Sequence, residues 1–156
     1  MKPLNQALKG IKMGNFILIE GDKANFLPTF GAATVVVRAG DLKGSGPATL
    51  KSKKICVDGD EKNVSVAGCT YMTSQYSIPG TGTLKIDALA SDQKATKTKT
   101  GGKAVLLKGG NFTAKFEVQS PAQQPPPGPG SPIPDSTTQY SGKGMFVTTN
   151  SLFQGT

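Results

Sequence analysis

The chain has 156 residues and a mass of 16.1 kDa, and its 18 basic residues exceed its 10 acidic residues to give a net charge of +8. It contains no histidine or tryptophan and only two cysteines, which excludes Ser–His–Asp and Cys–His catalysis and leaves too few thiolates for a structural zinc site. We therefore expect a binding or structural protein that is not an enzyme, with no cofactor, no metal ligands and no catalytic residues.

The predicted elements are short strands separated by glycine and proline. The 20 glycines and 11 prolines favour many turns and few long helices. Residues 1–14 carry Leu4, Leu8 and Ile11 at roughly helical spacing, which predicts a short N-terminal arm. Runs of β-branched or alternating apolar residues predict strands at residues 15–19, 34–38, 50–57, 64–66, 83–89, 104–108, 112–118 and 145–149.

The strand at residues 112–118 has the clearest period-2 alternation in the chain. The side chains expected on its core face are Phe112, Ala114, Phe116 and Val118. Together with the other runs, this strand predicts an all-β fold whose β-rich core domain occupies residues 15–120.

Glycines and aspartates between the predicted strands are expected to form turns. The residues expected in these turns are Asp58, Gly59, Gly80, Gly82, Gly109 and Gly110. Asp-Gly is typical of a tight hairpin connection because it tolerates positive φ angles. Residues 80–85 lack the spacing of a phosphate-binding loop, and Asp58, Asp60 and Glu61 lack the frame of an EF-hand. We therefore expect neither a nucleotide site nor a calcium site here.

The composition changes after residue 120. Seven of the eleven prolines fall within residues 121–134. Because proline has no N–H to donate, we expect an extended spacer without sheet hydrogen bonds, or a polyproline strip that binds an aromatic groove. Residues 135–156 are expected to form a C-terminal extension with one short strand, which returns to the sheet or docks on a partner.

Cys56 and Cys69 leave two alternatives open. They form a disulfide if the compartment is oxidising, or they remain reduced thiols in the core. The apolar run Phe16–Ile19 is too short for a signal peptide and is followed directly by Glu20. We therefore expect synthesis in the cytoplasm without a signal peptide, and we find no run long enough to span a membrane.

Lysine supplies almost all of the positive charge, since Arg38 is the only arginine. Arginine is the side chain that contacts phosphate and guanine in a bidentate way, so we expect no specific nucleic-acid partner. The alternative is a basic β-barrel module that binds nucleic acid or an anionic glycan, which would expose aromatic side chains on one face. A second alternative is a particle subunit that assembles with itself.

Three segments between residues 54 and 122 carry a resemblance to a known family. They are ICVDGDEKNVSVAGCTY at 55–71, PGTGTLKI at 79–86 and GKAVLLKGGNFTAKFEV at 102–118. The second contains a G-x-G-x-(V/L)-x-I pattern, and the third contains a Gly-Lys-x-Val pattern. In these motifs the region resembles the PAAR-like spike-tip proteins of contractile injection systems, which include type VI secretion systems and phage-tail-like particles.

The resemblance implies a small, turn-rich cone of short strands and β-hairpins. It also implies a mechanical role: a tip that sharpens a trimeric β-helical spike of the VgrG-like type, helps to carry toxin or effector cargo, and contacts the target membrane only mechanically. Such a tip is assembled into a particle and delivered extracellularly. Members of the PAAR group hold zinc near the tip with histidines and a cysteine. Because this chain has no histidine, the resemblance implies a tip without metal, closed by packing or by a Cys56–Cys69 bond.

Overall fold

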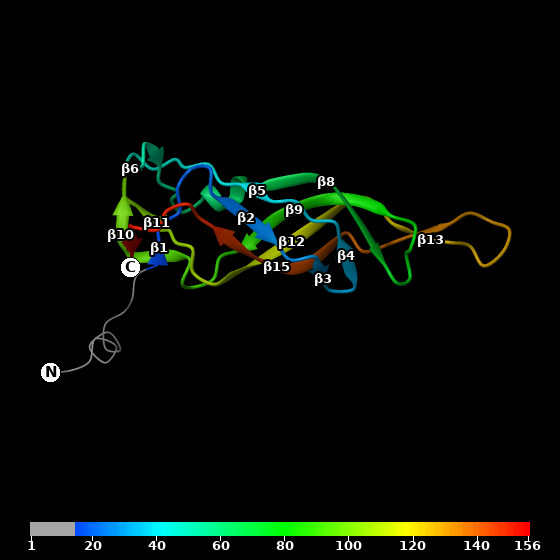
Figure 1. Ribbon diagram of the computed structural model, residues 1–156. Coiled ribbons are helices and arrows are strands. Elements are labelled where there is room, and N and C mark those ends of the chain that lie inside the picture. Colours follow the sequence, from blue (N-terminus) through cyan, green and yellow to red (C-terminus); the bar gives the residue numbers. More distant parts are fainter. Residues whose placement is uncertain (1–14) are drawn as a thin grey trace.

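The computed structural model describes residues 15–156, which form an elongated molecule built almost entirely of short strands (Figure 1). The elements are β1 (Asn15–Phe16), β2 (Lys23–Phe26), β3 (Thr29–Phe30), β4 (Ala33–Val35), β5 (Gly40–Asp41), β6 (Thr49–Leu50), β7 (Lys53–Lys54), η1 (Asp60–Asn63), β8 (Ser65–Thr73), β9 (Gly80–Ala88), β10 (Lys94–Thr100), β11 (Lys103–Leu106), β12 (Asn111–Ser120), β13 (Gln123–Gln124), β14 (Ile133–Pro134), β15 (Gln139–Val147) and β16 (Gln154–Gly155). Among the described residues, the one helical element is η1, a single turn of 3-10 helix. The prediction of a turn-rich, all-β fold is confirmed.

The principal sheet has eight strands in the order β3-β4-β8-β9-β12-β15-β2-β5, and all neighbours are antiparallel. At its centre, Phe116 of β12 lies opposite Leu84 of β9 and Tyr140 of β15. The sheet curls on itself, because the edge strand β3 contacts β15 and the other edge strand β5 contacts β8. This curl encloses the main core.

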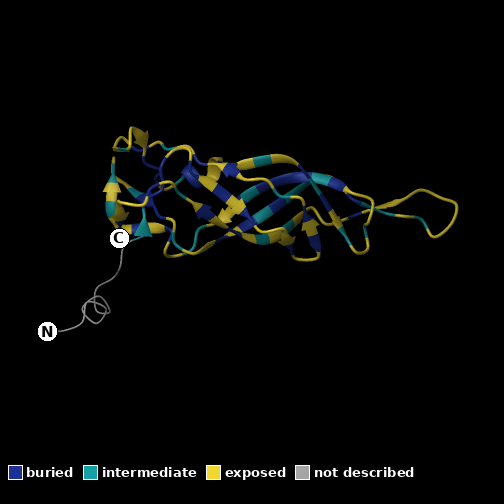
Figure 2. Cartoon of the chain, viewed as in Figure 1, coloured by how far each residue is buried: buried dark blue, intermediate teal, exposed yellow. Residues whose placement is uncertain are grey.

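The pattern of β12 shows how the sequence builds that core. Its inward-facing Phe112, Ala114 and Phe116 are fully buried, and Val118 on the same face is half-buried. The ring centroid of Phe112 lies 4.9 Å from that of Phe146, a distance typical of aromatic pairs. Figure 2 shows buried stretches in the strands of the curled sheet and an exposed loop at the far end.

Glycine in the neighbouring strand makes room for these rings. A Cβ atom on Gly144 of β15 would lie 2.5 Å from the ring of Phe112 and 2.5 Å from the backbone oxygen of Asn25. The absence of a side chain therefore allows the ring of Phe112 to cover the strand.

A second group of short strands lies at one end of the molecule (Figure 1). There β1 pairs with β16, β6 with β7, and β10 with β11. Isolated bridges, such as Val57 with Val105, connect these elements. They surround a separate apolar cluster of Ile17, Ile19, Ile55, Val57, Ala95, Val105 and Leu107. This end of the molecule thus has a small core of its own.

At the opposite end, β13 and β14 form a short hairpin whose loop projects from the curled sheet (Figure 1). Gln123 also exchanges two backbone hydrogen bonds of 2.9 Å with Ile78. The prediction that residues 121–134 lack sheet hydrogen bonds is therefore wrong. Gln123, Gln124 and Ile133 retain their N–H groups, and most of the prolines lie in the loop between the two strands.

Two other predicted elements differ from the structure. Residues 135–156 do not carry one short strand: β15 has nine residues and lies between β12 and β2, and β16 pairs with β1. The strand expected at residues 50–57 is interrupted because Lys51 and Ser52 adopt positive φ angles and turn the chain from β6 to β7. The arm expected at residues 1–14 lies outside the described residues.

Candidate functional site

The two ends of the molecule differ in charge. We call the end with the second core the lysine end; it comprises residues 15–21, 45–59, 91–110 and 148–156. It contains eight exposed lysines against three acidic residues, a net charge of +5. The eight lysines are Lys51, Lys53, Lys54, Lys94, Lys97, Lys99, Lys103 and Lys108. Three further carboxylates bond to this end: Asp22 accepts from Ile19 and Thr149, Asp60 from Val57 and Ser45, and Glu61 from Gly59. These three are buried, so the charge that this end exposes to solvent is still mainly that of its lysines.

The lysine end also presents two apolar side chains to solvent. Leu152 is 73% exposed and Phe153 is 49% exposed. Both follow Asn150, which is buried and organises the turn: its Oδ1 accepts hydrogen bonds from the backbone N–H groups of Leu152 and Phe153, and its Nδ2 donates to the oxygens of Ile17 and Phe153. All four distances lie between 2.8 and 3.1 Å. The turn is therefore held in one conformation with its apolar side chains facing outward.

We call residues 122–135 the proline hairpin. A buried polar network fixes it to the end of the curled sheet. The carboxylate of Asp135 accepts hydrogen bonds from the hydroxyls of Tyr71 (3.0 Å) and Tyr140 (2.6 Å) and from the N–H of Thr137 (2.9 Å). The hydroxyl of Tyr71 accepts a 2.9 Å bond from the N–H of Ala122. Both ends of the proline hairpin are thus bonded to a tyrosine of β8.

This network shifts the pKa values of its members. Burial opposes ionisation of Asp135, but the hydrogen bonds from Tyr140, Thr137 and Tyr71 outweigh it and hold its pKa below the usual range. Burial raises the pKa of Tyr71 to about 12, against the lowering effect of the Ala122 N–H, and the Asp135 carboxylate adds to the rise. Asp135 therefore remains an anion, and Tyr71 remains a neutral donor, at neutral pH.

Between its two buried ends, Ala122 and Asp135, the proline hairpin is uncharged and largely exposed. No residue between Gln119 and Pro134 has an ionisable side chain. Ile133 is 52% exposed, and the loop from residue 127 to residue 132 is exposed throughout. The molecule therefore has one lysine-rich end, a curled sheet that carries charges of both signs, and one uncharged projection.

The two cysteines are free and buried in the main core. The thiol of Cys69 donates a weak hydrogen bond to the backbone oxygen of Val66. Burial raises the pKa of the Cys56 thiol to about 12, and the nearby Asp60, Asp22 and Glu20 raise it further. Of the two alternatives left open by the sequence, the structure contains the pair of core thiols and no Cys56–Cys69 bond.

The predicted turn residues divide into two groups. Gly109 has a φ of 50° and lies in the connection after β11, which Gly110 continues. Gly80 and Gly82 lie inside β9 and form no turn. A Cβ on Gly82 would lie 2.5 Å from the ring of Phe116, so this glycine allows the ring to pack on the strand.

The prediction that Asp58 and Gly59 connect a hairpin is wrong. These two residues form a turn that leads into η1, and Gly59, the N-cap of η1, has a φ of 102°. Asp60 is buried and accepts hydrogen bonds from Val57 and Ser45. Glu61 is buried as well and accepts one from the N–H of Gly59. These carboxylates therefore stabilise the turn.

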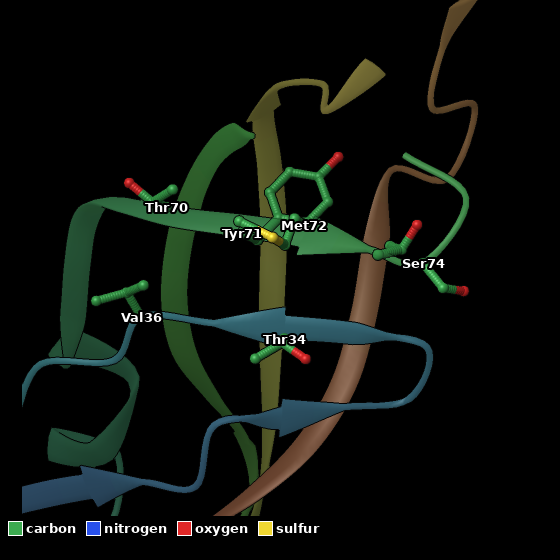
Figure 3. Close-up of a pocket in the computed structure, with 7 residues that line it drawn as sticks. Thr34, Val36, Thr70, Tyr71, Met72 and Ser74 are labelled. Carbon is green, nitrogen blue, oxygen red and sulfur yellow. The ribbon is translucent and has the colours of Figure 1, made fainter. Parts of the chain in front are cut away.

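An open hollow lies on the outer face of β4 and β8 (Figure 3). It is lined by Thr34, Val36, Thr70, Tyr71, Met72, Thr73 and Ser74. None of these is an acid, lysine or arginine, and the hydroxyl of Tyr71 is already bonded to Asp135. The hollow thus has no pair of groups for general acid–base catalysis.

Nucleic-acid stacking, metal binding and membrane spanning each have a structural requirement. Of the seven phenylalanines in the chain, five are buried in the curled sheet, so they do not form an exposed stacking face. Within residues 15–156, no three His, Cys, Asp or Glu side chains gather into a candidate metal site. The same residues include no helix with the length and apolarity needed to cross a membrane.

These features define a small all-β structural or binding module with two chemically distinct ends. A family model described as "Contractile injection system spike tip protein" matches residues 13–156, which is nearly the whole chain, and the chain belongs to this family. The resemblance seen in the sequence is thereby confirmed. A search of curated proteins found no match to the chain.

Sequence reasoning missed the Asp135 network, the Asn150 turn and the collection of lysines at one end. The lysines come from two segments distant in the chain, residues 51–54 and 94–108, and only the run at residues 94–103 is conspicuous in the sequence. The one local signal in the sequence was an acidic residue, Asp135, directly after the proline-rich segment.

Proposed function

We infer that the chain is a non-enzymatic cap that sits as a single copy on the end of a trimeric β-helical spike, of the VgrG-like type, in a contractile injection system. It binds the spike with its lysine end and presents the proline hairpin as the leading point. Its work is mechanical, so it needs no cofactor, and it contacts the target membrane only as the particle penetrates.

The proposal is based on the chemical difference between the two ends of this elongated molecule. It is also based on the membership of the chain in a spike-tip family. One end has its own core, exposed apolar side chains and eight exposed lysines. The other end is a narrow projection without charge, so no ionised group has to leave water when it leads into a bilayer. A toxin or effector attached to this chain would be delivered with it, outside the producing cell.

The alternative of a basic barrel for nucleic acid or glycan is less well supported. Its stacking face would require exposed rings, whereas most rings form the core. Its phosphate contacts would depend almost entirely on lysine, which attracts phosphate without bidentate geometry.

The proposal is tested by mixing the purified chain with the trimeric spike protein of the same injection system and measuring the mass of the complex. One chain per spike trimer is the expected result. The absence of any complex, or binding to the side of the spike in several copies, would contradict the proposal.

A further inference from the structure

We propose that the surface bound by the lysine end is an acidic protein surface with an apolar recess that accepts Leu152 and Phe153. This inference rests on the proposed function, and the acidic surface is then the distal end of the spike. The proposal concerns the chemistry of the contact, which family membership does not specify.

The first argument is the way in which Leu152 and Phe153 are presented. Large apolar side chains at a protein surface are common singly, but here two adjacent ones are held outward by the four hydrogen bonds of a buried asparagine. Such a preorganised turn loses little conformational entropy on binding, and a buried aromatic anchor is typical of the residues that dominate interface energies.

The second argument is the charge that surrounds this turn. The backbone on each side of it is bonded to lysine-bearing segments: the oxygen of Thr149 accepts a bond from Nζ of Lys51, and the oxygen of Thr156 accepts one from the N–H of Lys97. Within the described chain, Lys94 is the one lysine of this end that lies within 4 Å of a carboxylate, that of Asp58 at 3.6 Å. Asp22 also accepts a hydrogen bond from the N–H of Thr149, but its side chain is buried. The exposed charges near the apolar pair are therefore mainly those of lysines without a carboxylate partner, and an acidic rim on the partner complements them.

A protein partner fits this surface better than a nucleic acid. Nucleic-acid sites combine cationic side chains with several exposed rings, and here Phe153 is the one phenylalanine exposed at this end of the described structure. Leu152, which is more exposed than Phe153, offers no stacking surface but fills an apolar recess.

The test uses the trimeric spike protein of the same injection system and compares its affinity for matched variants. One variant carries Leu152→Ser and Phe153→Ser, and another carries Lys97→Glu, Lys99→Glu and Lys103→Glu. Controls are Leu27→Ser, which removes an exposed apolar side chain of the curled sheet, and Lys143→Glu, which reverses a charge there. Thermal unfolding of each variant verifies that it is folded.

We expect each lysine-end variant to bind about tenfold more weakly or worse, and each control to bind within about twofold of the wild type. The wild-type affinity should fall as salt rises, and the triple lysine variant should lose most of that dependence. If the wild type binds the spike and both lysine-end variants bind equally well, the inference is wrong while the proposed function stands. If the wild type does not bind the spike at all, the proposed function itself fails.

The same variants also distinguish two other binding partners of the lysine end, a nucleic acid and a second copy of the chain. Tight binding of a mixed-sequence oligonucleotide at physiological salt, lost in the triple lysine variant, would assign this end to nucleic acid and overturn the inference. Self-association of the chain that is lost with Leu152→Ser and Phe153→Ser would assign it to a second copy of the chain and would also overturn it.

A second measurement locates the contact without altering the proposed anchors. Both native thiols are buried, so a single added cysteine can be labelled selectively with a fluorophore. The matched positions are Ser151→Cys at the lysine end and Ser131→Cys in the proline hairpin, both of which are exposed. Adding the spike should change the emission of the label at position 151 and leave that at position 131 unchanged. The reverse pattern would refute the inference.

Discussion

Replacing Tyr71 with phenylalanine should loosen the attachment of the proline hairpin without disturbing the packing of the ring. The hydroxyl donates to Asp135 at 3.0 Å and accepts from the N–H of Ala122 at 2.9 Å. Its removal leaves a buried N–H unpaired, which costs about 1–3 kcal/mol, and deprives a buried carboxylate of one of its three donors. Because Tyr140 and Thr137 still donate to Asp135, we expect a total loss of about 3 kcal/mol in the free energy of unfolding.

Urea unfolding measures this loss. With a slope of about 2 kcal/mol per molar urea, the midpoint should fall by about 1.5 M. Tyr76→Phe is the matched control, because the hydroxyl of this half-buried tyrosine has no hydrogen-bond partner in the described structure, and it should change the midpoint little. Equal midpoints for the two variants, or a loss below about 1 kcal/mol for Tyr71→Phe, would refute the role assigned to the network.

Four further outcomes are expected. The folded-state pKa of Asp135 is lowered, so its contribution to stability is present above about pH 4 and is lost as the pH falls through the folded value. The difference in unfolding free energy between the wild type and Asp135→Asn should therefore shrink when unfolding is measured in acid. Gly144→Ala should cost about 1–3 kcal/mol or more in urea unfolding because the added Cβ meets a ring, whereas Gly128→Ala, with open space around it, should be nearly neutral. Cys56, whose pKa is raised to about 12, should resist alkylation at pH 8 in the folded chain and react in urea; rapid labelling without denaturant would contradict its burial. Replacing residues 125–132 with Asn-Gly should leave the circular dichroism and the cooperative melt intact, because this loop contributes no side chain to either core; loss of the melt would place the loop in the folding unit.

The strands that the sequence predicted best are those with uninterrupted alternation. Phe112, Ala114 and Phe116 alternate with polar residues, and β12 has the expected period-2 burial. The alternation of β15 was hidden because Gly142 and Gly144 occupy positions where rings of the core cover the strand. A glycine selected by close packing looks in the sequence like a glycine selected for a turn, and this explains why a central strand was predicted as a short terminal one.

The candidate site was harder to predict than the fold. Composition revealed an excess of lysine, but its collection at one end depends on contacts between distant segments, such as the hydrogen bonds from Asn150 to Ile17 and from Lys51 to Thr149. The density of prolines suggested an extended segment, and only the structure shows that its two ends pair with each other and are fixed through Asp135. The family could be recognised from the sequence because the motifs that resemble it lie in single turns and strands. Such local structure is visible in short sequence patterns.

The most direct test is an electron cryomicroscopy reconstruction of the assembled particle, without imposed symmetry at the spike end, from cells with and without this chain. We predict one copy at the distal end of the spike, with the lysine end seated on the spike and the proline hairpin pointing away along its axis. That density should be absent from particles that lack the chain. Unchanged density at the spike end, or a copy seated with its proline hairpin against the spike, would contradict the proposed function or its polarity.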